Sequence, residues 1–240
     1  MTTFNHVKFG IKKDFINEGY SIPFVLDFKS RPHLAIFGST GSGKTYASKL
    51  LLGKISKFIK DSEFIICDYK GDSDFDFLLD KNNFYRFEQV PKGIDKMIEI
   101  LEKRQKKEDE SRNFVLLFFD EWASFLNSLS KKESDLYKSK LSMLLMLGRS
   151  FNLHVIISQQ RSDAIHFGTA RDNFSVVITL GSLSKESIQM LFSQYKNEIT
   201  PNQSIGNGYI LEDGKSLNEI LIPKIKNMTV LEKEISMKVL

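Results

Sequence analysis

A glycine-rich loop between a strand pattern and a helix pattern constrains this chain more than any other feature. Residues 38–45 read Gly-Ser-Thr-Gly-Ser-Gly-Lys-Thr, which matches the pattern G-x-x-x-x-G-K-[ST]. An apolar run at 33–37 precedes the loop, and a helix-period pattern over 44–60 follows it. A loop in this context wraps a phosphate, because glycines lack a Cβ and let backbone N–H groups turn inward. The loop therefore predicts a nucleoside-triphosphate site on an α/β sheet.

The loop residues have distinct expected tasks. The N-terminus of the following helix adds partial positive charge beside the phosphates. The Lys44 ammonium is expected to reach the β- and γ-phosphates, and the Thr45 hydroxyl to bind Mg²⁺. ATP and Mg²⁺ are thus the expected ligands; the competing interpretation is a glycine-rich turn with an unrelated lysine. The expected nucleotide-binding residues are Gly38, Ser39, Thr40, Gly41, Ser42, Gly43, Lys44 and Thr45.

Strand and helix patterns alternate after residue 32. Strands are predicted at 33–37, 63–67, 114–119, 153–158, 174–180 and 208–211. Helices are predicted at 44–60, 92–107, 133–148 and 184–195. Continuous Val/Ile/Leu/Phe strands separated by helices indicate an α/β fold with a mostly parallel sheet and helices on both faces, which with the phosphate loop predicts a P-loop NTPase. The predicted organisation is a β-rich N-terminal lead-in at 1–31 and a P-loop NTPase domain at 32–240.

Composition indicates the class of protein but does not identify its binding partner. The 240 residues are 41% hydrophobic and 27% charged, as in ordinary globular proteins. The net charge of +4 permits a polyanionic partner but does not establish one. The single cysteine, Cys67, excludes a disulfide framework and fits a reducing compartment. Because no apolar run approaches the ~20 residues of a membrane span and the N-terminus lacks a signal-peptide layout, no integral membrane segment and a cytoplasmic location are expected.

Two carboxylates end the apolar run at 114–119. Asp120 is expected to orient Mg²⁺. Glu121, the next residue, can polarise a water for in-line attack on the γ-phosphate. Taken alone the pair could cap a helix, but beside a phosphate loop it favours a hydrolysing motor over a small-molecule kinase.

Two further polar residues and one charged segment each carry two interpretations. Gln160 follows the strand at 153–158, where it either senses the γ-phosphate or belongs to a polar loop. Arg149 follows a leucine-rich helix, where it either reaches a neighbouring subunit's γ-phosphate as an arginine finger or forms a surface salt bridge. Segment 103–112 is rich in charge and is interpreted as a solvated helix end and exposed loop, with a DNA contact as the alternative. The expected catalytic residues are Glu121, Lys44, Arg149 and Gln160.

Taken together, these segments resemble the FtsK/SpoIIIE branch of the FtsK–HerA ATPases. The resemblance covers 33–211 and rests on the loop at 38–45, Cys67-Asp68-Tyr69-Lys70-Gly71, Phe118-Phe119-Asp120-Glu121-Trp122, the run 148–161, Asn173-Phe174 and Gly206-Asn207-Gly208-Tyr209. Members are typically hexameric rings that thread double-stranded DNA using ATP. The resemblance implies a RecA-like P-loop NTPase fold, with a RecA-like, FtsK/HerA-type ATPase domain at 32–240. The resemblance implies that Gln160 is the sensor glutamine, that Arg149 is the arginine finger, and that Asp68 and Lys70 lie near the site and the subunit boundary.

The resemblance also implies binding partners, and a few residues of this chain differ from the family's usual pattern. The family usually has proline where Ser162 stands, and arginines where Val177 and Gly181 stand. No room remains for a C-terminal winged-helix domain, so we expect a minimal DNA translocase of a plasmid or other mobile element, in transfer or replication. Its expected partners are double-stranded DNA, copies of itself in a hexameric ring, and a relaxase or replication initiator. The loop 161–171 is the expected DNA contact. The alternative is a P-loop ATPase that remodels a protein partner without threading DNA.

Overall fold

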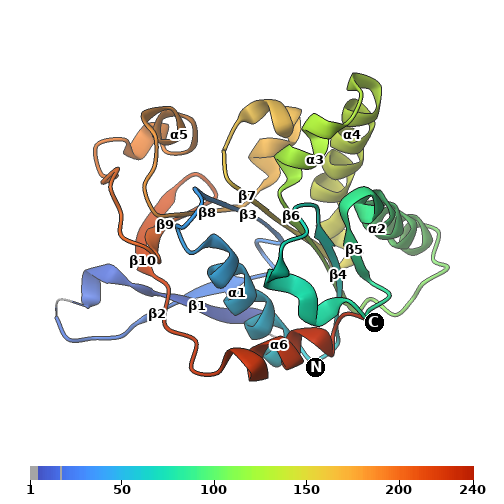
Figure 1. The fold of residues 1–240 in the computed structure, drawn as a ribbon, viewed down its shortest axis with the longest axis horizontal. Coiled ribbons are helices and arrows are strands. Elements are labelled where there is room, and N and C mark those ends of the chain that lie inside the picture. Colours follow the sequence, from blue (N-terminus) through green and yellow to red (C-terminus); the bar gives the residue numbers. More distant parts are fainter. Residues whose placement is uncertain (1–4, 17) are drawn as a thin grey trace.

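One ten-stranded sheet organises the chain (Figure 1). The computed structural model describes residues 5–16 and 18–240. The strand order is β2-β1-β10-β9-β8-β3-β7-β6-β4-β5. The strands are β1 (His6–Lys12), β2 (Pro23–Asp27), β3 (His33–Gly38), β4 (Ser62–Asp68), β5 (Phe84–Arg86), β6 (Phe114–Asp120), β7 (Leu153–Gln159), β8 (Val176–Leu180), β9 (Asn207–Glu212) and β10 (Ser216–Leu221).

Helices cover both faces of this sheet. They are α1 (Lys44–Phe58), α2 (Val90–Gln105), α3 (Trp122–Ser128), α4 (Lys131–Leu147), α5 (Lys185–Leu191) and α6 (Met228–Ser236). Figure 1 shows α1 and α6 on one side of the strands and α2, α3 and α4 on the other. Within the described residues, no helix is both long and apolar enough to cross a bilayer.

The strands β8, β3, β7, β6, β4 and β5 run parallel to one another. Successive side chains of β3 alternate between the two faces: Leu34 and Ile36 join the core under α1, whereas Ala35 and Phe37 join the core under α2 and α4. Both faces are therefore buried, which is why these strands read as continuous apolar runs. The predicted α/β fold with a mostly parallel sheet and helices on both faces is confirmed.

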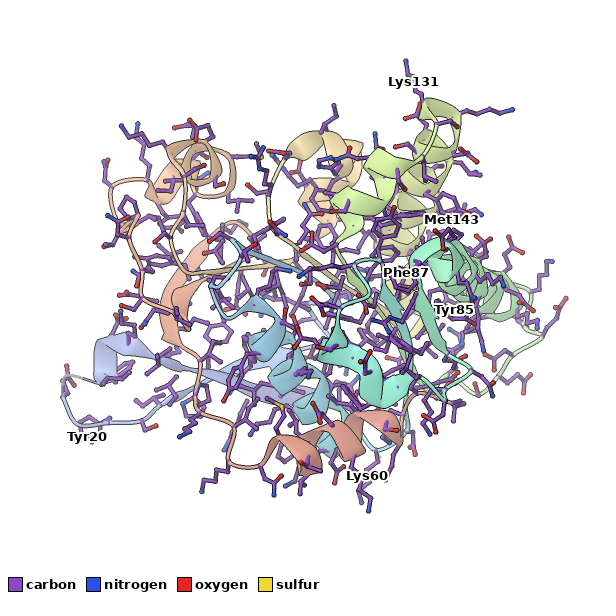
Figure 2. All side chains as sticks on the ribbon, viewed as in Figure 1. Tyr20, Lys60, Tyr85, Phe87, Lys131 and Met143 are labelled. Atoms are coloured by element: carbon purple, nitrogen blue, oxygen red, sulfur yellow. The ribbon has the colours of Figure 1, made fainter. Side chains whose placement is uncertain are left out.

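The remaining strands extend the sheet with antiparallel pairings. β8 pairs with β9, β9 with β10, β10 with β1, and β1 with β2. The predicted lead-in at 1–31 thus contributes two strands to the same sheet; its residues 1–4 and 17 lie outside the described residues, and the boundary at residue 31 stays a prediction. Figure 2 shows Tyr20 at the far end of the connection between β1 and β2.

The sequence patterns missed several elements. β10 and α6 follow the last predicted strand, and α3 is a seven-residue helix directly after β6. β10 buries only Ile220 fully among its six residues, so it lacks the apolar run that marks the central strands. β8 begins at Val176 rather than at residue 174, because the preceding residues, 168–173, form a 3₁₀ segment.

The charged segment 103–112 differs from its interpretation as wholly solvated. Arg104 is buried, and its guanidinium donates to Asp109 Oδ2 at 2.8 Å, to the Asn113 carbonyl at 3.0 Å and to the Phe151 carbonyl at 2.6 Å. These bonds tie the end of α2 to the segment before β7. The other residues from 105 to 112 form an exposed helix end and loop with the half-buried Asp109, as predicted. The alternative of a DNA contact stays untested.

Candidate nucleotide-binding and hydrolysis site

The loop at 38–45 leaves β3 and enters α1, which begins at Lys44. Gly43 caps the helix with a φ of 91°, a left-handed conformation that residues with a Cβ rarely adopt. Gly38 is needed for a different reason: a Cβ there would lie 2.5 Å from Ser42 Oγ and 2.9 Å from the Leu180 carbonyl oxygen. The loop therefore has the tight, glycine-dependent shape that exposes backbone N–H groups to a phosphate.

Lys44 connects the loop to the acidic end of β6. Its ammonium group donates to Glu121 Oε1 at 3.1 Å, to Asp120 Oδ1 at 3.4 Å and to Ser158 Oγ at 3.1 Å. The Lys44 side chain is only 8% exposed, and both carboxylates are similarly buried. A cation held between two carboxylates in a low-dielectric site is poised to exchange one anionic partner for another, such as a phosphate.

The sheet register brings these groups together. Asp120 ends β6 and pairs with Ser158 of β7 on one side and with Asp68 of β4 on the other. The Glu121 N–H donates to the Ser158 carbonyl at 2.7 Å, and Glu121 has a φ of 61° in the left-handed region. This left-handed backbone conformation, directly before α3, is strained for a residue with a Cβ, and such residues are frequent at functional sites.

The two glutamines after β7 have different surroundings. Gln160 is exposed, and its Oε1 accepts a bond from the Thr40 hydroxyl at 3.4 Å. The Gln160 side chain therefore lies against the phosphate loop, and its role as a γ-phosphate sensor stays a prediction. Gln159 is buried, accepts from the Ala123 N–H at 3.2 Å and donates to the Arg161 carbonyl. Gln159 thus fixes the start of α3 beside Glu121, a positioning contact that the sequence did not reveal.

A pocket of 360 Å³ opens over the loop. Its walls include the loop, both carboxylates, Gln160, Lys70 and the exposed Ile205. Among the described residues, no three His, Cys, Asp or Glu side chains gather into a metal site. A hydroxyl and one carboxylate nevertheless suit Mg²⁺, which keeps several waters and takes further ligands from substrate phosphates. Thr45 and Asp120, which line this pocket, have the donor chemistry for that role.

A family model described as "Helicase HerA, central domain" matches residues 15–140, more than half of the chain. The chain belongs to this family. The predicted FtsK–HerA membership is thereby confirmed. The HerA-type chain is also 26% identical over 196 residues to the FtsK domain-containing protein YdcQ of Bacillus subtilis, a match that covers 76% of this chain and 41% of YdcQ. The chain therefore spans about two fifths of the length of that relative.

Solved structures share the fold at low sequence identity. The pCW3 conjugation coupling protein TcpA, in its monomer form with ATPγS, has a TM-score of 0.73 and 16% identity, covering 99% of this chain and 72% of that one. EccC of Thermomonospora curvata (ATPases 2 and 3), in complex with a signal sequence peptide, has a TM-score of 0.70 and 16% identity, covering 99% and 46%. At these identities the likeness supports the fold of the HerA-type chain.

Arg149 lies at the end of the HerA-type sheet where the parallel strands begin, opposite the end that carries the phosphate loop. It sits in the 3₁₀ segment Gly148–Phe151 that leads into β7, and a Cβ on Gly148 would lie 3.2 Å from His33 at the start of β3. The phosphate loop begins at the far end of that strand, about 16 Å away at 3.3 Å per residue. Arg149 is exposed, and none of the ion pairs found among residues 5–16 and 18–240 includes it. The structure does not bring Arg149 to its own chain's phosphate site.

Asp68 and Lys70 surround the tip of β4. The Asp68 carboxylate is buried, accepts from the Gly71 N–H at 2.8 Å and lies 3.3 Å from Arg86 Nε without a hydrogen bond. Burial raises the pKa of Asp68 to about 6, although the Gly71 N–H opposes this shift. Lys70 is half exposed on the pocket wall and pairs with Asp72 Oδ2 at 2.7 Å. Both residues therefore lie near the site, as the resemblance implied, and their position at a subunit boundary stays a prediction.

The three residues that depart from the family pattern lie in ordered surroundings, and one departure has a steric reason. Gly181 has a φ of 70°, and a Cβ there would lie 2.7 Å from Ser42 Cβ, so an arginine at this position would displace the phosphate loop. Val177 lies inside β8, paired with Ala35 and Leu211. Ser162 is buried and donates to the Ser187 hydroxyl at 3.3 Å. Besides Gln159, sequence reasoning missed Ser158 and Ile205. The available signal for Ser158 was a hydroxyl at the end of a strand that neighbours the acidic pair.

Proposed function

We propose that this chain is an ATP-hydrolysing DNA translocase of the FtsK–HerA type, acting in the transfer or replication of a plasmid or other mobile element. One observation carries the hydrolytic part of this proposal: the Lys44 ammonium lies 3.1 Å from Glu121 and 3.4 Å from Asp120, next to the phosphate loop. This arrangement supplies a cation for the phosphates, a ligand for a metal and a base for water within one pocket.

In the proposed reaction, Lys44 leaves its carboxylate partners and binds the β- and γ-phosphate oxygens. The released Glu121 carboxylate then orients a water in line with the γ-phosphorus and takes its proton. The water oxygen bonds to phosphorus as the bond to the β–γ bridging oxygen breaks, and ADP leaves. Mg²⁺, held by Thr45 and Asp120, would neutralise charge on the phosphates. Gln160, bonded to Thr40 of the loop, is suited to report loss of the γ-phosphate to the segment after β7.

The partner assignments rest on family membership and on charge. TcpA, which shares this fold, is a conjugation coupling protein, and this likeness supports a DNA substrate for the present chain. A ring of copies would place the exposed Arg149 of one subunit at the phosphate site of the next and would multiply the +4 charge of each chain. We propose double-stranded DNA as substrate, a hexameric ring as the active form, a cytoplasmic location, and a relaxase or replication initiator as partner. Contacts to phosphates carry little base information, so binding should show little sequence preference.

The test is ATP turnover with and without linear duplex DNA across a salt series. Duplex DNA should raise the rate, and the stimulation should weaken as salt rises, because phosphate contacts release counterions. Replacing Arg161 and Arg171 together by alanine tests the loop 161–171 as the DNA contact, with basal turnover as the control.

A remodelling ATPase that acts on a protein is the second candidate. The observation that favours it is the fold shared with EccC, whose structure contains a signal sequence peptide. Turnover that rises with a partner protein but never with duplex DNA at low salt would select this candidate over the translocase.

A further inference from the structure

An exposed isoleucine stands on the wall of the candidate nucleotide pocket. The Ile205 side chain is 75% exposed, the highest value among the large apolar side chains of the part of the chain that the structure describes. It lines the same 360 Å³ pocket as Lys44, Asp120 and Glu121. An apolar side chain left open to solvent inside an otherwise polar pocket gains contact area only when an apolar group of a ligand covers it.

The segment that carries Ile205 is fixed to the phosphate loop. The Gly206 N–H donates to the Ser42 carbonyl at 3.1 Å, and the Gly206 carbonyl accepts from the Ile222 N–H at 2.7 Å. A Cβ on Gly43 would lie 3.5 Å from Ile205 Cγ2, so the isoleucine sits directly against the loop. These contacts hold the side chain at a set distance from bound phosphates.

The position of Ile205 along the pocket identifies which part of a nucleotide it meets. The γ-phosphate end is marked by Glu121 and Gln160. Backbone N–H groups at the start of α1 bind the phosphates nearer the nucleoside. Ile205 lies beside Gly43 at that start, and Tyr46 of α1 lines the same pocket while its hydroxyl accepts from the Ile225 N–H. The nucleoside therefore leaves the loop on the side where Ile205 stands.

We propose that Ile205 is the contact surface for the face of the nucleobase. This inference rests on the proposed function, since it requires a nucleotide in the pocket. Every base presents an apolar face, and an aliphatic side chain does not read hydrogen bonds at its edges. Ile205 consequently contributes affinity without selecting adenine over guanine.

The test compares binding of ADP, GDP and pyrophosphate, each with Mg²⁺, to wild-type protein and to Ile205→Ala by calorimetry. Loss of the contact should weaken ADP and GDP equally, by about five- to tenfold, and should leave pyrophosphate unchanged. Ile205→Leu, which keeps the apolar surface, should bind all three ligands like the wild type. Leu79→Ala removes another highly exposed aliphatic side chain, outside this pocket, and is the control.

Three results would overturn the inference. ADP affinity unchanged in Ile205→Ala would mean that the base lies elsewhere. Equal weakening of ADP and pyrophosphate would mean that Ile205 shapes the phosphate loop instead. Weakening of ADP without GDP would mean that the segment selects adenine. Failure of the wild type to bind any of the three ligands would refute the nucleotide site itself, which separates the two proposals.

Discussion

The Lys44 ammonium lies 3.1 Å from the Glu121 carboxylate, although the two residues are 77 positions apart in the chain. One residue opens α1 and the other follows β6. Their contact couples the phosphate-binding loop to the group that is expected to activate water. The replacement of either side chain therefore affects both the chemistry and the stability of the site.

Replacing Lys44 by methionine should abolish binding of Mg·ATP and lower the stability of the nucleotide-free protein. Without the ammonium, the buried Asp120 and Glu121 carboxylates lose their shared cation, which should cost about 3 kcal/mol in the free energy of unfolding. Calorimetry and urea denaturation measure the two effects. Lys49→Met is the control: it breaks the ion pair of an equally buried lysine with the less buried Glu232, and it should destabilise the fold and spare nucleotide binding. Normal ATP binding by Lys44→Met would refute the assigned site.

Glu121→Gln should separate binding from turnover. The amide keeps the shape of the side chain but cannot take a proton from water, so turnover should fall by roughly two to four decades while ATP affinity stays within a few fold. Steady-state phosphate release and calorimetry provide the measurements. Glu133→Gln changes an exposed carboxylate at the start of α4 and should leave turnover unchanged. Near-normal turnover in Glu121→Gln would show that another group positions the water.

Arg149→Ala should spare ATP binding and reduce turnover, because Arg149 lies across the sheet from its own phosphate loop and would act on a neighbouring subunit. Mixing this variant with Glu121→Gln should restore part of the activity, since one interface of a mixed ring then contains both groups. Arg112→Ala removes another arginine at the same edge, one that donates to the Ser150 carbonyl, and should behave like the wild type. Absence of rescue at every mixing ratio, or full turnover by a dilute monomer, would contradict the role in trans.

Stability should fall below neutral pH because of a buried histidine. His33 Nδ1 accepts from the Val155 N–H at 3.2 Å, and burial lowers the pKa of His33 from 6.5 to about 3. The unfolded chain therefore binds the proton at a higher pH than the folded chain does. The stabilisation is complete above pH 6.5 and is lost as the pH falls toward 3, at about 1.4 kcal/mol per pH unit.

His33→Asn removes this titration and keeps an acceptor for the Val155 N–H, because Asn Oδ1 is bonded to Cγ as His Nδ1 is. Urea denaturation between pH 7 and 4 should therefore show a shallower loss of stability in the variant than in the wild type, by about one proton. Parallel slopes for the two proteins would mean that His33 titrates normally in the folded state.

Arg104→Ala should destabilise the fold by about 3 kcal/mol, because the Asn113 and Phe151 carbonyls lose a buried donor and a cavity forms. Urea denaturation measures the effect. Lys103→Ala, next to it in the same helical turn but exposed, should leave the unfolding midpoint unchanged. Equal midpoints for wild type and Arg104→Ala would show that the buried guanidinium does not support the segment before β7.

Local sequence patterns were sufficient to predict the structure wherever one short segment fixes its own conformation. The glycine-rich loop requires left-handed backbone at Gly43 and a close approach at Gly38, and the glycine spacing of the sequence meets both requirements. The central strands are buried on both faces, so each reads as an apolar run without reference to its neighbours. The ends of β6 and β7 could be predicted for the same reason, and with them the positions of Asp120, Glu121 and Gln160 at one edge of the sheet.

Other features depend on contacts between distant segments, which no local pattern encodes. β10 has as many polar as apolar residues and is a strand because β1 and β9 supply its hydrogen bonds. In the sequence Arg104 belongs to a charged segment that indicates an exposed surface. In the folded chain its guanidinium donates to carbonyls of two other segments. In the sequence Ile205 is an ordinary loop residue. In the folded chain the Gly206 N–H donates to the Ser42 carbonyl, and this bond holds Ile205 over the pocket. The sequence by itself determined the phosphate loop and the alternating core elements. The long-range hydrogen bonds and the burial of the folded chain decided which side chains meet at the candidate site.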